Sequence, residues 1–179
     1  MASQDDALAA LKTLLASLDV SPAPAGVWHY PNDYADMASV GYSKLPLVIC
    51  YDIVNTPDSW GRFQDGLGLH SWSIGISCLL YPGDITTMKS AVPAEMSHKG
   101  WVKALADLLL ANQTLNGTAL YIGDADLPAT LGEGGIVSGG VSQLFQARIG
   151  GIGGWFDRNF WGVEIALPIL QVHGQAMGG

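Results

Sequence analysis

The chain has 179 residues, of which 49% are hydrophobic and 13% are charged, and its net charge is −8. This length suits one domain with its own apolar core, and we expect a single domain over 1–179 with a flexible tail over 173–179. The eight basic residues are scattered singly, which excludes the basic stripe that binds a phosphate backbone. A charged fraction below the roughly 25% of ordinary soluble domains predicts a subunit that covers much of its surface with other copies of itself.

The N-terminal segment has the spacing of an amphipathic helix. Its leucines recur at steps of three and four residues: Leu8, Leu11, Leu15 and Leu18. Ser3 suits the N-cap, because its hydroxyl can accept a hydrogen bond from the first turn. Proline and glycine over 21–26 end the helix, and we interpret the aromatic stretch after them as an irregular connection. The segment has no basic start, and no run reaches about 18 apolar residues, so we expect neither a leader nor a membrane partner.

A long strand with two different faces is expected in the first half. Residues 46–54 are rich in β-branched side chains and predict one strand, and 55–68 predict a loop. The strict alternation over 69–81 predicts a second strand. Its apolar positions are Trp72, Ile74, Ile76, Cys78 and Leu80, and its small positions are Ser71, Ser73, Gly75 and Ser77. The small residues form a flat face that a second surface can approach closely.

The second half predicts another helix and another hairpin. The expected elements are a helix over 95–112, a short strand over 120–123, a long loop over 124–142, and strands over 143–150 and 161–172. Pro168 cannot donate a ladder hydrogen bond, so that part of the last strand is an edge or carries a bulge. The predicted fold class is α+β: an antiparallel sheet of about four strands in two hairpins, with an N-terminal helix and a central helix packed on it.

Residues 148–160, RIGGIGGWFDRNF, invite comparison with a phosphate-binding loop. Gly151 and Gly153 fit the first two places of G-x-G-x-x-G, but Phe156 occupies the third. A strand is expected to follow, so no helix N-terminus is present to hold an anion. We therefore interpret the glycines as a bend or bulge near the tip of the last hairpin, and we expect no cofactor.

Acidic residues near the predicted strand ends leave a metal-dependent hydrolase open as an alternative. They are Asp52, Asp84, Asp124 and Asp126. The four histidines have no ligand spacing, and no serine-nucleophile motif occurs, so we predict no catalytic residue and no metal site. Cys50 and Cys78 lie in apolar runs and predict buried thiols in a protein made in a reducing compartment.

Aromatic and arginine side chains gather in or beside the two hairpin loops. This composition is typical of protein–protein contacts, and it is equally typical of aromatic lids that fold back on the chain's own sheet. The candidate subunit-interface residues are Trp60, Arg62, Phe63, Trp155, Phe156, Arg158 and Phe160. A small-ligand module built around this cluster and the 124–142 loop is a further alternative.

Four stretches together resemble the tail terminator (tail completion) proteins of long-tailed bacteriophages. They are DDALAALKTLLASL, LPLVICYDI, HSWSIGISCLLY and GVEIALPI. The resemblance spans most of the chain and implies an α+β structural virion protein rather than an enzyme. It implies a homo-oligomeric ring, expected to be a hexamer, that terminates the tail tube and joins it to the head-neck.

The resemblance also implies partners and a location. The expected partners are other copies of the chain, the tail-tube protein and the head-neck connector proteins, with DNA passing through the lumen without specific binding. The expected location is the virion tail or neck, after synthesis in the host cytoplasm. Another neck or tail-tube component is an alternative, because such proteins share this size and pattern.

Overall fold

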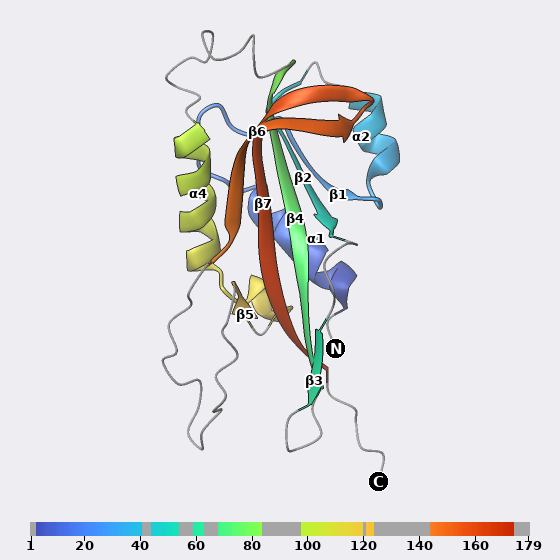
Figure 1. The fold of residues 1–179 in the computed structure, drawn as a ribbon, viewed down its shortest axis with the longest axis vertical. Coiled ribbons are helices and arrows are strands. Elements are labelled where there is room, and N and C mark those ends of the chain that lie inside the picture. The colour runs from blue at the N-terminus through green and yellow to red at the C-terminus, as the bar shows by residue number, and fades with distance from the viewer. Residues whose placement is uncertain are drawn as a thin grey trace.

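The structure is a computed structural model that describes residues 3–40, 44–53, 59–62, 68–83, 98–119, 121–123 and 144–173. Its elements are α1 (Gln4–Leu15), β1 (Gly26–Tyr30), α2 (Tyr34–Val40), β2 (Leu47–Asp52), β3 (Ser59–Arg62), β4 (Gly68–Pro82), α4 (His98–Ala111), the 3-10 turn η2 (Leu115–Gly117), β5 (Tyr121–Ile122), β6 (Gln146–Trp155) and β7 (Arg158–His173). The described strands form one sheet, with helices packed against it (Figure 1). The α+β class is thus confirmed.

Helix α1 begins where the sequence predicts. The Ser3 hydroxyl accepts a hydrogen bond from the Asp6 N–H at 3.1 Å, and the Asp6 carboxylate accepts one from the Ser3 N–H at 2.7 Å. These reciprocal bonds form a capping box that satisfies two backbone donors of the helix start. The bonds from Ser3 also lower the pKa of Asp6 below its usual value. Local chemistry therefore fixes the start of this helix.

The sheet is mixed, so the prediction of four antiparallel strands in two hairpins is incomplete. Its order is β1-β2-β4-β7-β5, with β3 on β4 and β6 on β7. The β1–β2 pair is parallel and the other pairs are antiparallel. The interpretation of the stretch after 21–26 as irregular is wrong, because it contains β1 and α2. Both elements are too short to show a clear period.

A second difference lies inside the predicted 55–68 loop, where β3 pairs with the start of β4. β2 pairs with β4 farther along the same side, over Ile74–Leu79. In the same way, β6 and β5 share the outer side of β7. The long strands β4 and β7 therefore form the centre of the sheet, and each is flanked by two shorter strands in tandem.

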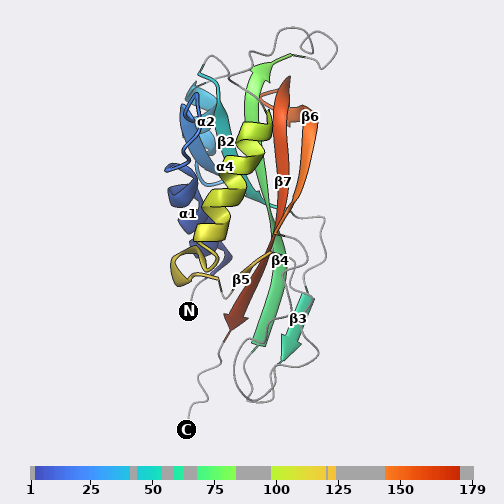
Figure 2. The same cartoon turned by 90° about the vertical axis from the view of Figure 1, so that its left-hand side faces the viewer.

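One face of the sheet is covered by α1 and α4, which Figure 2 shows on the same side. Apolar side chains from α1, α4, β2, β4 and β7 meet there in the main core. The fully or almost fully buried members include Leu11, Leu15, Cys50, Ile74, Ile76, Trp101, Leu105, Val163 and Leu167. The strand members of this list are apolar positions of the alternating strands, so the predicted buried face is confirmed.

The opposite face has a second, smaller core at one end. Its buried residues come from β1, α2, β2, β4, β6 and β7: Trp28, Met37, Leu47, Ile49, Leu79, Ile152 and Phe160. In Figure 1 the tip of the β6–β7 hairpin bends across the upper end of the sheet toward α2. The bent hairpin and α2 cover this end of the face, and no helix of the described residues lies over the rest of it.

The glycine-rich stretch forms most of that bent hairpin. Both strands run on to a two-residue turn at Phe156 and Asp157, whose φ angles are 55° and 53°. The pairing shifts between Ile152 and Trp155, and Gly154 has a φ of 88°. The predicted bulge is confirmed, and the chain continues as a strand rather than as the helix of a nucleotide site. The strands run closer to the turn than predicted, because Gly151, Gly153 and Gly154 lie within β6.

Pro168 lies in β7, opposite Ser73 of the central strand β4. Its carbonyl accepts a hydrogen bond from the Gly123 N–H at 2.8 Å, on the side of β7 that β5 and β6 share. The N and C=O of one strand residue point to the same side, so the proline nitrogen also points there. The proline nitrogen lies in the gap on that side between Ala166, which pairs with Gln146 at the start of β6, and Ile169, which pairs with Ile122 of β5. β7 is therefore a central strand, but neither β6 nor β5 pairs with it at Pro168. A proline is tolerated there as it is on an edge strand, because no ladder hydrogen bond is needed from its nitrogen.

Candidate functional site

The candidate site is the sheet face opposite α1 and α4. Alternate residues of β4 and β7 pair across this face: Ser73 with Pro168, Gly75 with Ala166, and Ser77 with Glu164. The small-residue face predicted from β4 is thus present and is continued by β7. One half of it is covered by the chain itself, and the other half is partly exposed.

Tyr51 of β2 covers the half that contains Gly75 and Ser77. Its ring lies directly over Gly75, where a Cβ would overlap it, and its hydroxyl lies 3.5 Å from the Ser77 Oγ. Gly75 and Ser77 are buried as a result. Small side chains at these positions therefore accommodate a large ring from the neighbouring strand.

Among the described residues, the part of the face beyond Tyr51 is the more exposed part. The side chains of Ser71, Ser73, Ala166 and Pro168 are partly exposed and lie side by side on β4 and β7; we call these four residues the open face. At its border, the Arg148 Nε donates to Glu164 Oε2 at 2.9 Å, and this ion pair lines a hollow of about 300 Å³ with Tyr51 and Ala166. The pairing with Glu164 raises the pKa of Arg148, so this border carries a neutralised pair.

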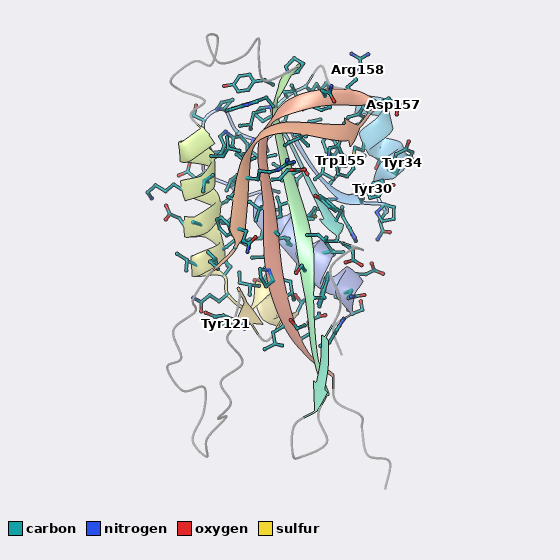
Figure 3. The ribbon with its side chains drawn as sticks, in the orientation of Figure 1. Tyr30, Tyr34, Tyr121, Trp155, Asp157 and Arg158 are labelled. Carbon is teal, nitrogen blue, oxygen red and sulfur yellow. The ribbon has the colours of Figure 1, made fainter. Side chains whose placement is uncertain are left out.

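Trp155 packs on its own chain. Its ring centroid is 5.5 Å from that of Tyr51 and 5.4 Å from that of Tyr30, in edge-to-face arrangements. Tyr34 lies edge-on to Tyr30 at 5.9 Å and is 57% exposed. Figure 3 shows Trp155 on the bent hairpin beside these two tyrosines. In the single subunit, Trp155 is a lid on the second core.

The remaining candidates on the hairpin are placed differently from one another. Phe160 is fully buried in the second core, so its side chain offers no contact surface in this subunit. The Phe156 ring lies 6.2 Å from the Phe160 ring and is partly buried. Arg158 is exposed at the tip, where it and Asp157 line a hollow of about 410 Å³ (Figure 3).

The candidates of the first loop lie far from that tip. Trp60 and Arg62 belong to β3, whose backbone pairs with the start of β4, and Phe63 lies outside the described residues. Figure 1 shows β3 at the lower end of the sheet and the hairpin tip at its upper end. Within the described residues, β3 and the hairpin tip therefore lie at opposite ends of the sheet.

The acidic residues proposed for metal binding are not assembled by the described part of the chain. Asp52 is exposed at the end of β2, and Asp84, Asp124 and Asp126 lie outside the described residues. Within the described ranges, no group of three or more His, Cys, Asp or Glu side chains is arranged to hold a metal ion.

A polar cluster that sequence reasoning missed closes the outer edge of β1. The Asp33 carboxylate accepts from the His29 N–H at 2.7 Å and from Lys12 Nζ at 2.5 Å, and the Asp33 N–H donates to the His29 carbonyl at 2.8 Å. Partial burial raises the pKa of Asp33, but the bonds from His29 and Lys12 outweigh it and leave the pKa below its usual value. Asp33 lies in a turn, and nothing in the spacing of the sequence marks its partners.

Both cysteines are buried free thiols, as the sequence predicts. Burial raises the pKa of each to about 12. A thiol with that pKa is almost entirely protonated at neutral pH, so neither residue is placed to act as a nucleophile.

No helix in the described ranges combines the length and the apolar character needed to span a bilayer. No protein-family model, curated protein or solved structure matches the chain.

Proposed function

We propose that this chain is a structural virion protein of a long-tailed bacteriophage. Its copies form a homo-oligomeric ring, a hexamer, that terminates the tail tube and joins it to the head-neck. The four stretches that resemble tail terminator proteins support this proposal, because they coincide with α1, β2, β4 and β7. These elements build the main core, so the resemblance involves the parts of the chain that define its fold.

The observation that carries the proposal is the open face. Ser71, Ser73, Ala166 and Pro168 form a flat, uncharged surface on the two longest strands of the sheet. Small side chains let another surface approach the sheet closely and lose little conformational entropy when they are buried. If a neighbouring copy covers this face, less of the subunit surface has to remain in water. This agrees with the low charged fraction of 13%.

The charge of the chain suits a ring around DNA. A net charge of −8 repels a polyphosphate, so the genome would slide past without being held. This part of the proposal predicts that residues facing the lumen are mainly acidic or neutral. A ring structure with a basic lumen would contradict it.

The test is the native mass of the purified chain over a wide range of protein concentrations, alone and with assembled tail tubes. A discrete hexamer, or a ring that binds the tube end and stops further tube growth, is the expected result. Growth of the chain itself into long tubes would favour the alternative, a tail-tube component. A monomer at every concentration, with and without tubes, would contradict assembly altogether.

A further inference from the structure

The outer edge of β6 differs from the outer edge of β1. Among the described residues β6 pairs only with β7, and the side chains of Gln146, Ala147, Arg148 and Ile149 are all exposed. At β1, both the N–H and the C=O of His29 are engaged by Asp33, as described above. At His29 the outward groups of β1 are therefore bonded within the chain, whereas the side chains along the outer edge of β6 are exposed.

The register shows which backbone groups of β6 point outward. The Pro168 carbonyl points to the side of β7 that β6 shares, so the even-numbered residues of β7 face β6. Their partners in β6 are also even-numbered, for example Arg148 opposite Glu164. The N–H and C=O groups of Ala147 and Ile149 therefore point away from β7, and no described residue bonds them.

This edge has few of the features that usually prevent strand addition. Natural edge strands are protected by charged side chains, above all lysine, by proline or by a bulge; Gln146–Ile152 contains no lysine or proline, and its one charged residue, Arg148, is paired with Glu164. The bulge of β6 lies beyond Ile152. Ile149 is 41% exposed, one of the few large apolar side chains with that much exposure in the described ranges. An accessible apolar side chain on an unprotected edge is suited to strand addition.

The charge of the chain indicates what occupies the edge. Copies that each carry a net charge of −8 repel one another, so they must meet at a surface that is poor in acidic groups. β6 contains one charged residue, Arg148, and Glu164 neutralises it. At β1 the outward N–H and C=O of His29 are already bonded to Asp33, so these two groups are not available to pair with β6 of another copy. A ring joins two different surfaces of the subunit, and β6 is suited to be one of them.

We propose that the outer edge of β6 accepts an extended segment of a second copy of this chain, and that this strand addition is a ring contact. The inference rests on the proposed ring. It specifies main-chain hydrogen bonds from Ala147 and Ile149 as the source of affinity, and burial of the Ile149 side chain as the source of specificity.

The test compares two β6 variants with a control. Ile149→Lys places an ammonium group at the edge that strand addition would have to desolvate, and Ala147→Pro removes an outward N–H while the intrachain pairs stay intact. Tyr34→Lys makes a similar apolar-to-lysine change on α2, beside the closed edge, at a residue that is 57% exposed. Sedimentation at several concentrations reports assembly, and thermal unfolding of the dissociated chain reports folding.

Both β6 variants are expected to need at least about tenfold more protein to assemble, and Tyr34→Lys to assemble like the wild type. If Ala147→Pro fails to fold, Ile149→Lys alone decides, since its side chain already reaches solvent. Assembly of Ile149→Lys at wild-type concentrations would overturn the role of β6 and leave the ring intact. A wild-type chain that never assembles would instead remove the proposed ring, and this inference with it.

Discussion

Gly162 lies where β7 passes closest to β4, and replacing it with alanine gives the sharpest test of the packing. A Cβ at Gly162 would overlap the carbonyl oxygen of Cys78 and lie 3.0 Å from its carbonyl carbon, with Ile152 Cδ1 at 3.3 Å. The obstacle is backbone in the middle of the sheet, so it cannot rotate away as a side chain would. β4 and β7 would have to separate by on the order of 1 Å to restore van der Waals contact.

Such overpacking costs about 1–3 kcal/mol, and weakening one or two ladder hydrogen bonds adds about 1 kcal/mol. We expect Gly162→Ala to lower the free energy of unfolding by about 3 kcal/mol, which for a domain of this size lowers Tm by roughly 6–12 °C. Urea unfolding followed by circular dichroism measures this change. The matched control is Gly153→Ala in the same hairpin, where the nearest atom is Asn159 Oδ1 at 3.4 Å. A Gly162→Ala variant within about 0.5 kcal/mol of the wild type would refute this reasoning, because ordinary surface changes fall in that range.

Two further variants test the second core and the β1 edge. Trp155→Ala should lower the free energy of unfolding by about 2 kcal/mol, since it removes two edge-to-face contacts and uncovers Tyr51; unchanged unfolding together with lost assembly would show that Trp155 acts between subunits instead. Asp33→Asn should cost about 1.5 kcal/mol at pH 7 by removing the charge that Lys12 and the His29 N–H bind. Because the folded-state pKa of Asp33 is lowered, that stabilisation is present above the unfolded-state pKa of about 3.9 and is lost as the pH falls through the folded value. Urea titrations at several pH values should therefore show the wild type and Asp33→Asn converging below about pH 4, and a constant difference down to pH 2 would contradict this assignment.

The sequence predicts elements well where one local rule decides them. Ser3 and the leucine spacing specify α1, and strict alternation specifies β4, because each pattern concerns neighbours within a few residues. β1 and α2 escape prediction, because five and seven residues are too few for a period to show. The parallel pairing of β1 with β2 depends on contacts across the sheet, and single-sequence periodicity carries no information on it.

The candidate site is predicted only in part for the same reason. The small residues of β4 mark a face that accepts a close neighbour, but they do not indicate that Tyr51 occupies half of it. From its composition, Trp155 is equally suited to be a lid on its own subunit or a contact with another. The contacts that the bend of β6 makes with Tyr51 and Tyr30 show the lid in the single subunit. The accessible edge of β6 follows from the strand order, which involves residues as far apart in the sequence as Gly68 and His173.

The pairing of β4 with β7 also has a mechanical consequence. The two strands pair from Gly68 opposite His173 to Pro82 opposite Phe160, a ladder about 50 Å long at the usual rise per residue. A pull along the strand axis loads all of these hydrogen bonds at once in shear, whereas a pull across the axis would open them one after another. The subunit is therefore stiffest along its long axis, and a load applied at the hairpin tip passes directly to the opposite end of the sheet.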